Sequence, residues 1–316
     1  MQAFSELVSG TTASIATSGG HDTAQSSAQS ETPAPSTTKG STTGKTVQET
    51  AAQVPAGPQI SGEAAKKARI PILMYHVIST PPAGQPMSEL WVPKARFRSQ
   101  AEALKKAGYE AITMEQAMNA WQKGASIPEK PIVLTFDDGY LTQSTNAGPI
   151  LEKLGWKGVL YLTTRNIGPT IPAASVKKLI RLGWELGSHT ITHPDLTKLG
   201  AADLQKELED SRLQLQAQFG QPVDAFCYPT GANNETVRAA TKAAGYTSAT
   251  TVVGGIADGA QDPFALPRVR VTPDDTPKLL LKKIEAFKAG AVPADAPGGY
   301  TLPSTQTAPQ TSQVTG

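Results

Sequence analysis

The chain is poor in cysteine, in long apolar runs and in net charge. Cys227 is the only cysteine in 316 residues, so no disulfide can form within the chain, and a small buried core residue is the favoured interpretation of its thiol. No apolar run approaches the roughly 20 residues of a membrane-spanning helix. The formal net charge is +2, with Lys and Arg scattered among Asp and Glu. That balance predicts neither a nucleic-acid partner nor an acidic membrane surface.

Both ends of the chain lack a periodic apolar pattern. Residues 1–68 are mostly Ser, Thr, Ala, Gln, Gly and Pro, with one aromatic, Phe4. Such a segment buries too little apolar surface to offset its ordering entropy, so we predict disorder there and in the similar residues 290–316. Residues 69–289 remain as the one folded domain. Residues 1–20 contain no basic n-region and no apolar h-region, so no signal peptide is visible in the sequence as given.

Strand and helix patterns alternate through the domain. Short apolar runs between Gly and Pro signals predict strands at 70–78, 109–113, 131–136, 158–162, 184–188, 225–228, 246–251 and 266–271. Spacings of three and four predict helices at 97–107, 115–123, 145–154, 173–182, 201–219, 234–244 and 276–289. This alternation predicts an α/β domain of parallel βαβ units, with active groups at the carboxyl ends of the strands.

Two adjacent carboxylates end one of the predicted strands. Asp137 and Asp138 follow the buried run that ends at Phe136, and ionised carboxylates at a buried strand end require a cation or an ion-pair partner. His189 and His193 lie four residues apart after another apolar stretch. One carboxylate and two neutral imidazoles would leave coordination positions open for water and substrate, which is typical of a catalytic metal. The second carboxylate would then be free for proton transfer.

These residues carry a resemblance to a known family. Thr-Phe-Asp-Asp-Gly-Tyr at 135–140 and Ser-His-Thr-Ile-Thr-His at 188–193 resemble motifs of the polysaccharide deacetylases, also called the NodB homology domain or carbohydrate esterase family 4. Leu-Met-Tyr-His at 73–76, Phe-Cys-Tyr-Pro-Thr-Gly at 226–231 and Leu-Pro-Arg at 266–268 follow the order of the family. The motifs at 73–76 and 266–268 are similar to those of the poly-N-acetylglucosamine deacetylase branch.

The resemblance implies an irregular, incomplete (β/α)7-type barrel and a metal-dependent hydrolase. The implied substrate is a polysaccharide containing N-acetylglucosamine, with poly-β-1,6-N-acetylglucosamine slightly favoured over peptidoglycan or chitin oligomers. The expected cofactor is Zn²⁺, with Co²⁺, Ni²⁺, Fe²⁺ or Mn²⁺ as alternatives. The family suggests an extracellular, periplasmic or cell-envelope monomer. Two other functions stay open: an esterase or amidase acting on a small molecule with the same metal site, and a non-catalytic carbohydrate-binding envelope protein.

The family's roles transfer where its motifs match. Asp137 resembles the general base, and the metal ligands correspond to Asp138, His189 and His193. The loop that donates backbone N–H groups to the oxyanion is similar to Tyr228, Pro229 and Thr230. For the Tyr228 side chain, packing and substrate contact are equally expected.

Two departures from the family affect the expected catalytic residues. Much of the family carries an Arg in the third motif, where this chain has Cys227, and the chain has no histidine after His193 to act as the general acid. Arg268 and Arg270 lie two residues apart on one predicted strand; we expect at most one of them to orient the base, and we expect Arg268. His76 is a candidate general acid, although a buried structural histidine is equally expected at that position.

Overall fold

The structure is a computed structural model that describes residues 57–291. Disorder was predicted for residues 1–68 and 290–316. Most of these two segments, residues 1–56 and 292–316, lies outside the described residues. Within the described part of the chain, no helix is both long and apolar enough to cross a membrane.

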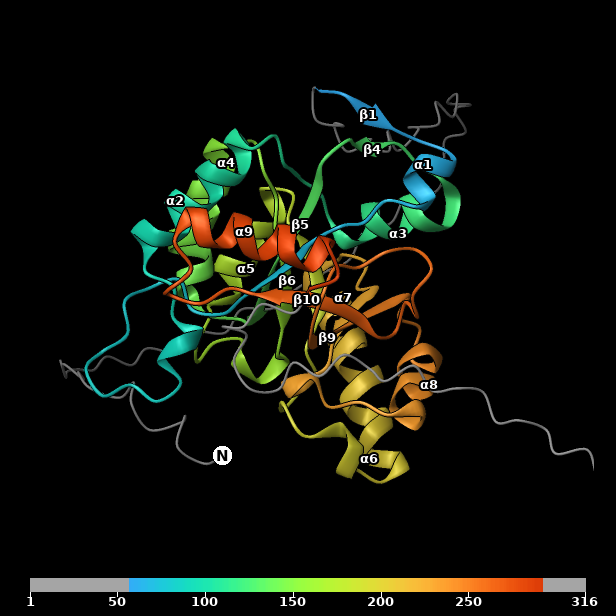
Figure 1. Ribbon diagram of the computed structural model, residues 1–316. Coiled ribbons are helices and arrows are strands. Elements are labelled where there is room, and N and C mark those ends of the chain that lie inside the picture. The colour runs from blue at the N-terminus through green and yellow to red at the C-terminus, as the bar shows by residue number, and fades with distance from the viewer. Residues whose placement is uncertain (1–56, 292–316) are drawn as a thin grey trace, which may run out of the picture. The chain divides into compact units, whose positions relative to one another are not determined.

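Seven parallel strands form a closed ring. Figure 1 shows the helices that lie around the labelled strands β5, β6, β9 and β10. The first strand, β2, pairs with both β5 and β10, which closes the ring, and the shared register of β7 and β8 is a single residue pair. A short strand, β3 (Glu110–Ala111), adds to the beginning of β5. The predicted irregular seven-stranded barrel is therefore confirmed. Its strands are β2 (Ile72–Tyr75), β5 (Pro131–Asp138), β6 (Val159–Leu162), β7 (Glu185–Ser188), β8 (Ala225–Cys227), β9 (Ser248–Gly254) and β10 (Leu266–Arg270).

Helices follow most of these strands and cover the outside of the barrel, as predicted. They are α2 (Lys94–Lys106), α3 (Met114–Lys123), α4 (Gly148–Lys153), α5 (Ala173–Arg181), α6 (Ala201–Gln205), α7 (Ser211–Phe219), α8 (Glu235–Ala243) and α9 (Pro277–Lys288). Two predicted helices contain a π-helical turn, a feature often found near functional sites. These turns are η2 (Gln143–Ala147), just before α4, and η5 (Lys206–Asp210), between α6 and α7. Short 3₁₀ turns are η1 (Ser88–Leu90), η3 (Thr164–Asn166), η4 (Leu196–Lys198) and η6 (Pro229–Gly231).

Side-chain alternation along β5 explains why Asp137 is buried in the barrel. Leu134 and Phe136 pack in the cluster that joins the strands to the outer helices. Val133 faces the other way, into the cluster that contains α3 and the barrel interior. Successive strand side chains point to opposite faces, so Thr135 and Asp137 lie on the same side as Val133. The strand therefore places one carboxylate of the Asp-Asp pair inside the barrel.

The ordered domain begins earlier than the predicted boundary at residue 69. Strand β1 (Gln59–Ile60) pairs with β4 (Ile127–Pro128), and α1 (Glu63–Lys66) packs against α3. Ala65 is fully buried, and Ala68 is nearly so. The sequence did not indicate these contacts because small alanines and one isoleucine in a polar stretch produce no periodic apolar pattern.

Glu185 at the start of β7 provides a stability prediction. One of its carboxylate oxygens accepts a hydrogen bond from the Glu115 N–H at the beginning of α3. Burial nevertheless raises its pKa to about 7, although part of the side chain reaches solvent. Because the folded state holds this proton more tightly than the unfolded state, Glu185 makes the protein less stable as the pH rises from about 4.5 to about 7.

We therefore expect Glu185→Gln to raise the free energy of unfolding by about 1–2 kcal/mol at pH 8 and by much less at pH 5. Urea denaturation at the two pH values measures the difference. The exposed Glu129→Gln is the control and should behave alike at both. Equal effects of Glu185→Gln at pH 5 and pH 8 would show that Glu185 does not titrate in this range.

Candidate active site

The chemically reactive side chains gather at the carboxyl ends of the barrel strands. Asp137 and Asp138 end β5, His189 directly follows β7, and His76 directly follows β2. Arg268 comes from β10, which is separated from β5 in the ring by β2. Strands far apart in the sequence therefore contribute to one site, as parallel βαβ units require.

Asp137 and Arg268 form a buried bidentate ion pair. Nη1 and Nη2 of Arg268 each lie 2.8 Å from one carboxylate oxygen of Asp137, and each side chain is at most 2% exposed. Further bonds from Arg268 reach the Thr251 carbonyl and the Thr135 hydroxyl, so the guanidinium is held on several sides. Burial alone would raise the pKa of Asp137, but the charge of Arg268 outweighs it and lowers that pKa below its ordinary range.

Cys227 lies beside this ion pair and contacts both partners. Its Sγ is 3.1 Å from Nη2 of Arg268 and 3.6 Å from Oδ2 of Asp137. Burial raises the pKa of the thiol, so it remains protonated at neutral pH and can donate a weak hydrogen bond to the carboxylate. The structure thus agrees with the buried, unreactive interpretation of Cys227. It adds a contact with the Asp137 carboxylate that no sequence signal indicated.

Asp138, His189 and His193 converge on one point. Oδ1 of Asp138 is 3.5 Å from Nε2 of His189 and 3.5 Å from Nε2 of His193. Three ligands about 2.1 Å from a tetrahedral ion lie about 3.4 Å from one another. Nδ1 of His189 is 2.6 Å from the Cys227 carbonyl; this bond requires the proton on Nδ1 and leaves the Nε2 lone pair free for a cation. The residues therefore fit a divalent metal ion.

A second group, Asp137, His189 and Cys227, also brings three potential ligand atoms close together. Here the carboxylate is already paired with Arg268, and His189 uses Nδ1 for the Cys227 carbonyl. A cation at this point would face the guanidinium and a protonated thiol. The group with Asp138 is therefore the better metal site.

The ligand loops hold unusual backbone conformations. Asp138 and His193 have positive φ angles of 74° and 62°, which are uncommon for residues other than glycine and are typically kept at functional sites. Gly139 follows with φ 89°, and a Cβ there would lie 2.2 Å from the Leu162 side chain. A tight turn thus follows the paired carboxylates, and only glycine fits it.

Supporting residues come from the two π-helical turns. Glu207 in η5 accepts hydrogen bonds from the N–H groups of Ile191 and Thr192, inside the loop between the two ligand histidines. In η2, the amide of Gln143 donates to the carbonyls of His76 and Asp137. These residues fix the backbone that carries the site. No sequence signal indicated their roles, because π-helical turns have no recognised residue spacing.

Only one residue of the segment predicted to bind the oxyanion keeps a backbone N–H without a hydrogen bond in the described part of the chain. The N–H of Tyr228 already bonds to the Thr250 carbonyl in the sheet, its hydroxyl bonds to the Phe264 carbonyl, and its ring is buried against Phe226. Pro229 has no N–H. Thr230 has a positive φ of 55°, and its N–H makes no hydrogen bond within the described residues. Tyr228 therefore packs, and Thr230 alone keeps a free donor.

His76 faces the Asp137 carboxylate. Its Nε2 lies 3.8 Å from Oδ2 of Asp137, and its side chain is 14% exposed. Burial lowers the pKa of His76 below its ordinary value, even though Asp137 and Asp138 work to raise it. The candidate acid thus lies at the site and not in the packed core.

Comparison with known proteins identifies the family. The family model described as polysaccharide deacetylase matches residues 124–249. The Bacillus subtilis (strain 168) protein named "Putative polysaccharide deacetylase YxkH" is 32% identical over 225 residues, covering 71% of this chain and 78% of that protein. The chain belongs to the polysaccharide deacetylase family.

Solved structures agree with this assignment. A Streptococcus pyogenes deacetylase, PplD, in complex with acetate, superposes with a TM-score of 0.65 at 28% identity, covering 69% of this chain and 99% of that one. The polysaccharide deacetylase BC0361 of Bacillus cereus gives a TM-score of 0.62 at 30% identity, covering 69% of each chain. Arg268 and His76 lie outside the residues that the family model matches, so their place in the site comes from the structure.

Proposed function

We propose that this protein is a metal-dependent hydrolase that removes N-acetyl groups from a polysaccharide containing N-acetylglucosamine. The observation that carries the proposal is the three-ligand group of Asp138, His189 and His193 next to a carboxylate that Arg268 holds in place. A carbohydrate-binding protein without activity would have no need for this buried, ion-paired carboxylate. An acetamide is a poor electrophile, and such a pairing of cation and base is a way to hydrolyse it.

Poly-β-1,6-N-acetylglucosamine is the favoured substrate. Support comes from a Staphylococcus aureus (strain MRSA252) enzyme named poly-β-1,6-N-acetyl-D-glucosamine N-deacetylase, which is 24% identical over 212 residues, covering 62% of this chain and 72% of that enzyme. The Met-Tyr-His and Leu-Pro-Arg elements point to the same branch. A polymeric substrate of this kind also suggests that the protein acts outside the cytoplasm.

Asp138, His189 and His193 would hold the metal, for which Zn²⁺ suits the two imidazoles and one carboxylate. A divalent ion there would polarise the acetamide carbonyl and lower the pKa of the attacking water. The other steps belong to the chain's own groups. Asp137 accepts the proton of that water, and Arg268 keeps the carboxylate ionised and fixed in orientation. The N–H of Thr230 stabilises the oxyanion of the tetrahedral intermediate.

Acetate release from a panel of N-acetylated glycans tests the proposal. We expect release from poly-β-1,6-N-acetylglucosamine, less from peptidoglycan and chitin oligomers, and none from any of them after chelation. Hydrolysis of small acetate esters with no release from any glycan would instead support an esterase with the same site.

His76 is the proposed acid that protonates the leaving amine. Its carbonyl is held by Gln143 independently of the side chain, so His76→Gln should keep the fold and the metal. We expect kcat to fall by roughly 10²–10⁴. The lowered pKa of His76 means that its protonated form is lost as the pH rises through a value below 6.5. The wild-type pH–rate profile should therefore fall on its alkaline side from that point, and the variant should lack this decrease.

Acetate release measured between pH 5 and pH 9 compares the two proteins. A variant that kept the same alkaline decrease with a modest loss of kcat would assign His76 an orienting role. The proton would then return to the amine from Asp137.

A further inference from the structure

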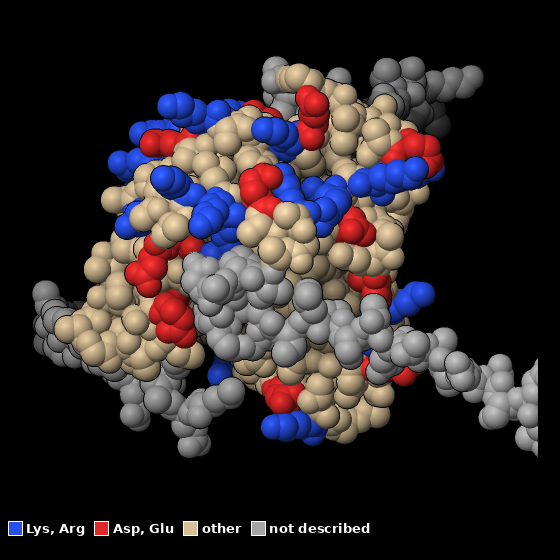
Figure 2. All heavy atoms as spheres, in the orientation of Figure 1, with Lys and Arg blue, Asp and Glu red and all other residues tan. Residues whose placement is uncertain are grey.

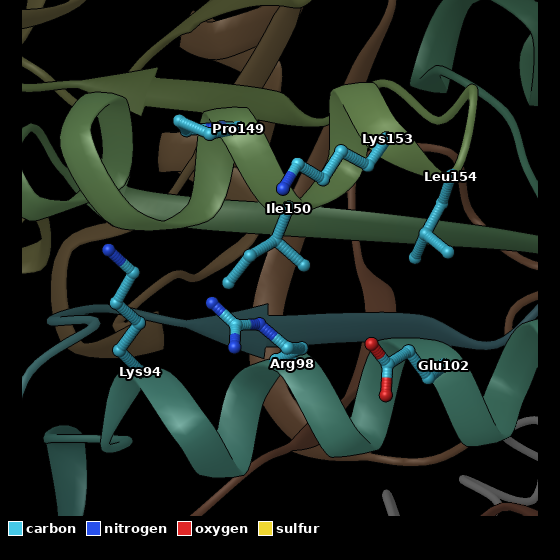
Figure 3. Close-up of a pocket in the computed structure, with 7 residues that line it drawn as sticks. All are labelled: Lys94, Arg98, Glu102, Pro149, Ile150, Lys153 and Leu154. Atoms are coloured by element: carbon cyan, nitrogen blue, oxygen red, sulfur yellow. The ribbon is translucent and has the colours of Figure 1, made fainter.

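A groove on the outside of the barrel runs between α2 and α4 (Figure 3). Its volume is about 190 Å³. Pro149, Ile150 and Leu154 supply its apolar surface, and Ile150 points from α4 toward α2. The groove lies on the helical layer and not at the carboxyl ends of the strands, so it is separate from the candidate active site.

Charged side chains border this apolar surface. Lys94 and Arg98 are one helical turn apart on α2, and Lys153 extends from α4 over the groove (Figure 3). All three are exposed. Within residues 57–291, none of the three side chains makes a hydrogen bond or an ion pair, and the same holds for Glu102, the one acidic residue at the groove. The groove therefore presents three unneutralised positive charges around an aliphatic floor.

The surrounding helices extend the positive charge. Helix α2 carries five basic residues and one acidic residue, and α5 carries three basic residues and none that is acidic. Helix α9 carries four lysines and one glutamate, although Lys283 is buried against Asp275 and Lys288 pairs with Glu285. Figure 2 shows blue side chains gathered where Figure 1 labels α2, α4 and α9. A surface of this kind attracts acidic partners over long range and raises their association rate.

We propose that the α2–α4 groove binds an acidic, amphipathic segment of another protein. Its aliphatic side chains would insert beside Ile150 and Leu154, and its Asp or Glu residues would pair with Lys94, Arg98 and Lys153. Apolar anchors surrounded by complementary charge are typical of a helix that binds in a groove. Arg98 adds a planar donor that can hold a carboxylate at two points.

Other anionic partners fit the groove less well. A sugar chain would find no aromatic ring there to stack on, and Glu102 is the only acceptor side chain for its hydroxyls. A lipid bilayer favours protruding apolar side chains, whereas Ile150 is 5% exposed and lies at the floor of a hollow. The combination of aliphatic floor and basic border therefore favours a peptide.

A peptide-display selection on the intact protein tests this proposal. A random peptide library is selected on the wild-type chain at about 0.15 M salt, where long-range charge effects are largely screened. We expect enriched sequences that combine Asp or Glu with Leu, Ile or Val at helical spacing. Fluorescence anisotropy then measures the affinity of the enriched peptides for each variant.

The triple variant Lys94→Gln/Arg98→Gln/Lys153→Gln should bind the enriched peptides with at least tenfold lower affinity. Lys67→Gln/Lys206→Gln/Lys242→Gln is the matched control; it removes three exposed positive charges elsewhere, also unpaired within the described residues, and should change affinity less than twofold. Both triple variants should release acetate as the wild type does, because neither touches the active site. Equal weakening by the two triples, binding of polyglutamate as tight as that of the selected peptides, or no enrichment would overturn the proposal.

Discussion

Chelation should abolish acetate release, and Zn²⁺, Co²⁺ or another first-row divalent ion should restore it. The reason is geometric: one carboxylate oxygen lies 3.5 Å from each of two imidazole nitrogens, too far for strong direct bonds but suited to a shared cation. Metal content by plasma emission and acetate release should rise together as metal is added back. A metal-free protein with full activity would contradict the proposed mechanism.

The ligand assignment can be tested with His193→Ala. The His193 side chain is 34% exposed, so its removal should leave the fold intact. We expect the loss of bound metal and a fall in activity greater than the roughly 10–100-fold that loss of a supporting residue costs. Lys198→Ala, an exposed change a few residues further along, is the control and should keep both. Stoichiometric metal in His193→Ala would show that the ligand set is wrong.

The sequence predicted the metal group more completely than the rest of the site. Two short motifs contain Asp138, His189 and His193. The four-residue spacing of the histidines and the position of both motifs at strand ends were sufficient to predict that the three residues meet. Arg268 lies on a remote strand, and the sequence pattern could not decide between it and Arg270, because residues two apart on a strand face the same side. The structure decides it, because Arg268 alone of the two reaches Asp137.

Other features depend on three-dimensional contacts that no spacing reveals. Cys227 contacts both Asp137 and Arg268 because three strands that are not neighbours, β8, β5 and β10, direct these side chains toward one point. Thr230 combines a left-handed backbone with an N–H that makes no hydrogen bond within the described residues, whereas the N–H groups of Tyr228 and Gly231 both bond to carbonyls. The distribution of surface charge also depends on the fold. The net charge of +2 does not indicate that basic residues gather on α2, α5 and α9.

Asp137→Asn and Asp138→Asn should separate proton transfer from metal binding. Asp137→Asn should keep the metal and lower kcat by roughly 10²–10⁴, because the amide cannot accept the proton of the attacking water. Asp138→Asn should lose metal instead, because it removes the charged ligand oxygen. Metal content and kcat, measured together for both variants, give the division of roles.

Asp137→Asn is also expected to destabilise the protein. Asp137 neutralises a guanidinium that is only 1% exposed, and breaking a buried ion pair by removing one partner costs about 3–5 kcal/mol. A fall in activity could then reflect unfolding and not the loss of a base. The chain offers a matched control in Asp275, which is also buried and lies 2.6 Å from the Nζ of the buried Lys283.

Asp275→Asn should destabilise the protein by a similar mechanism and yet keep kcat, when assayed at a temperature where the protein remains folded. A double variant, Asp137→Asn/Arg268→Met, should recover part of the lost stability, because the unpaired guanidinium is gone, and should stay as inactive as Asp137→Asn. If Asp137→Asn lost no more activity than Asp275→Asn, or if the double variant regained activity with stability, Asp137 would be a structural partner of Arg268 and the base would lie elsewhere.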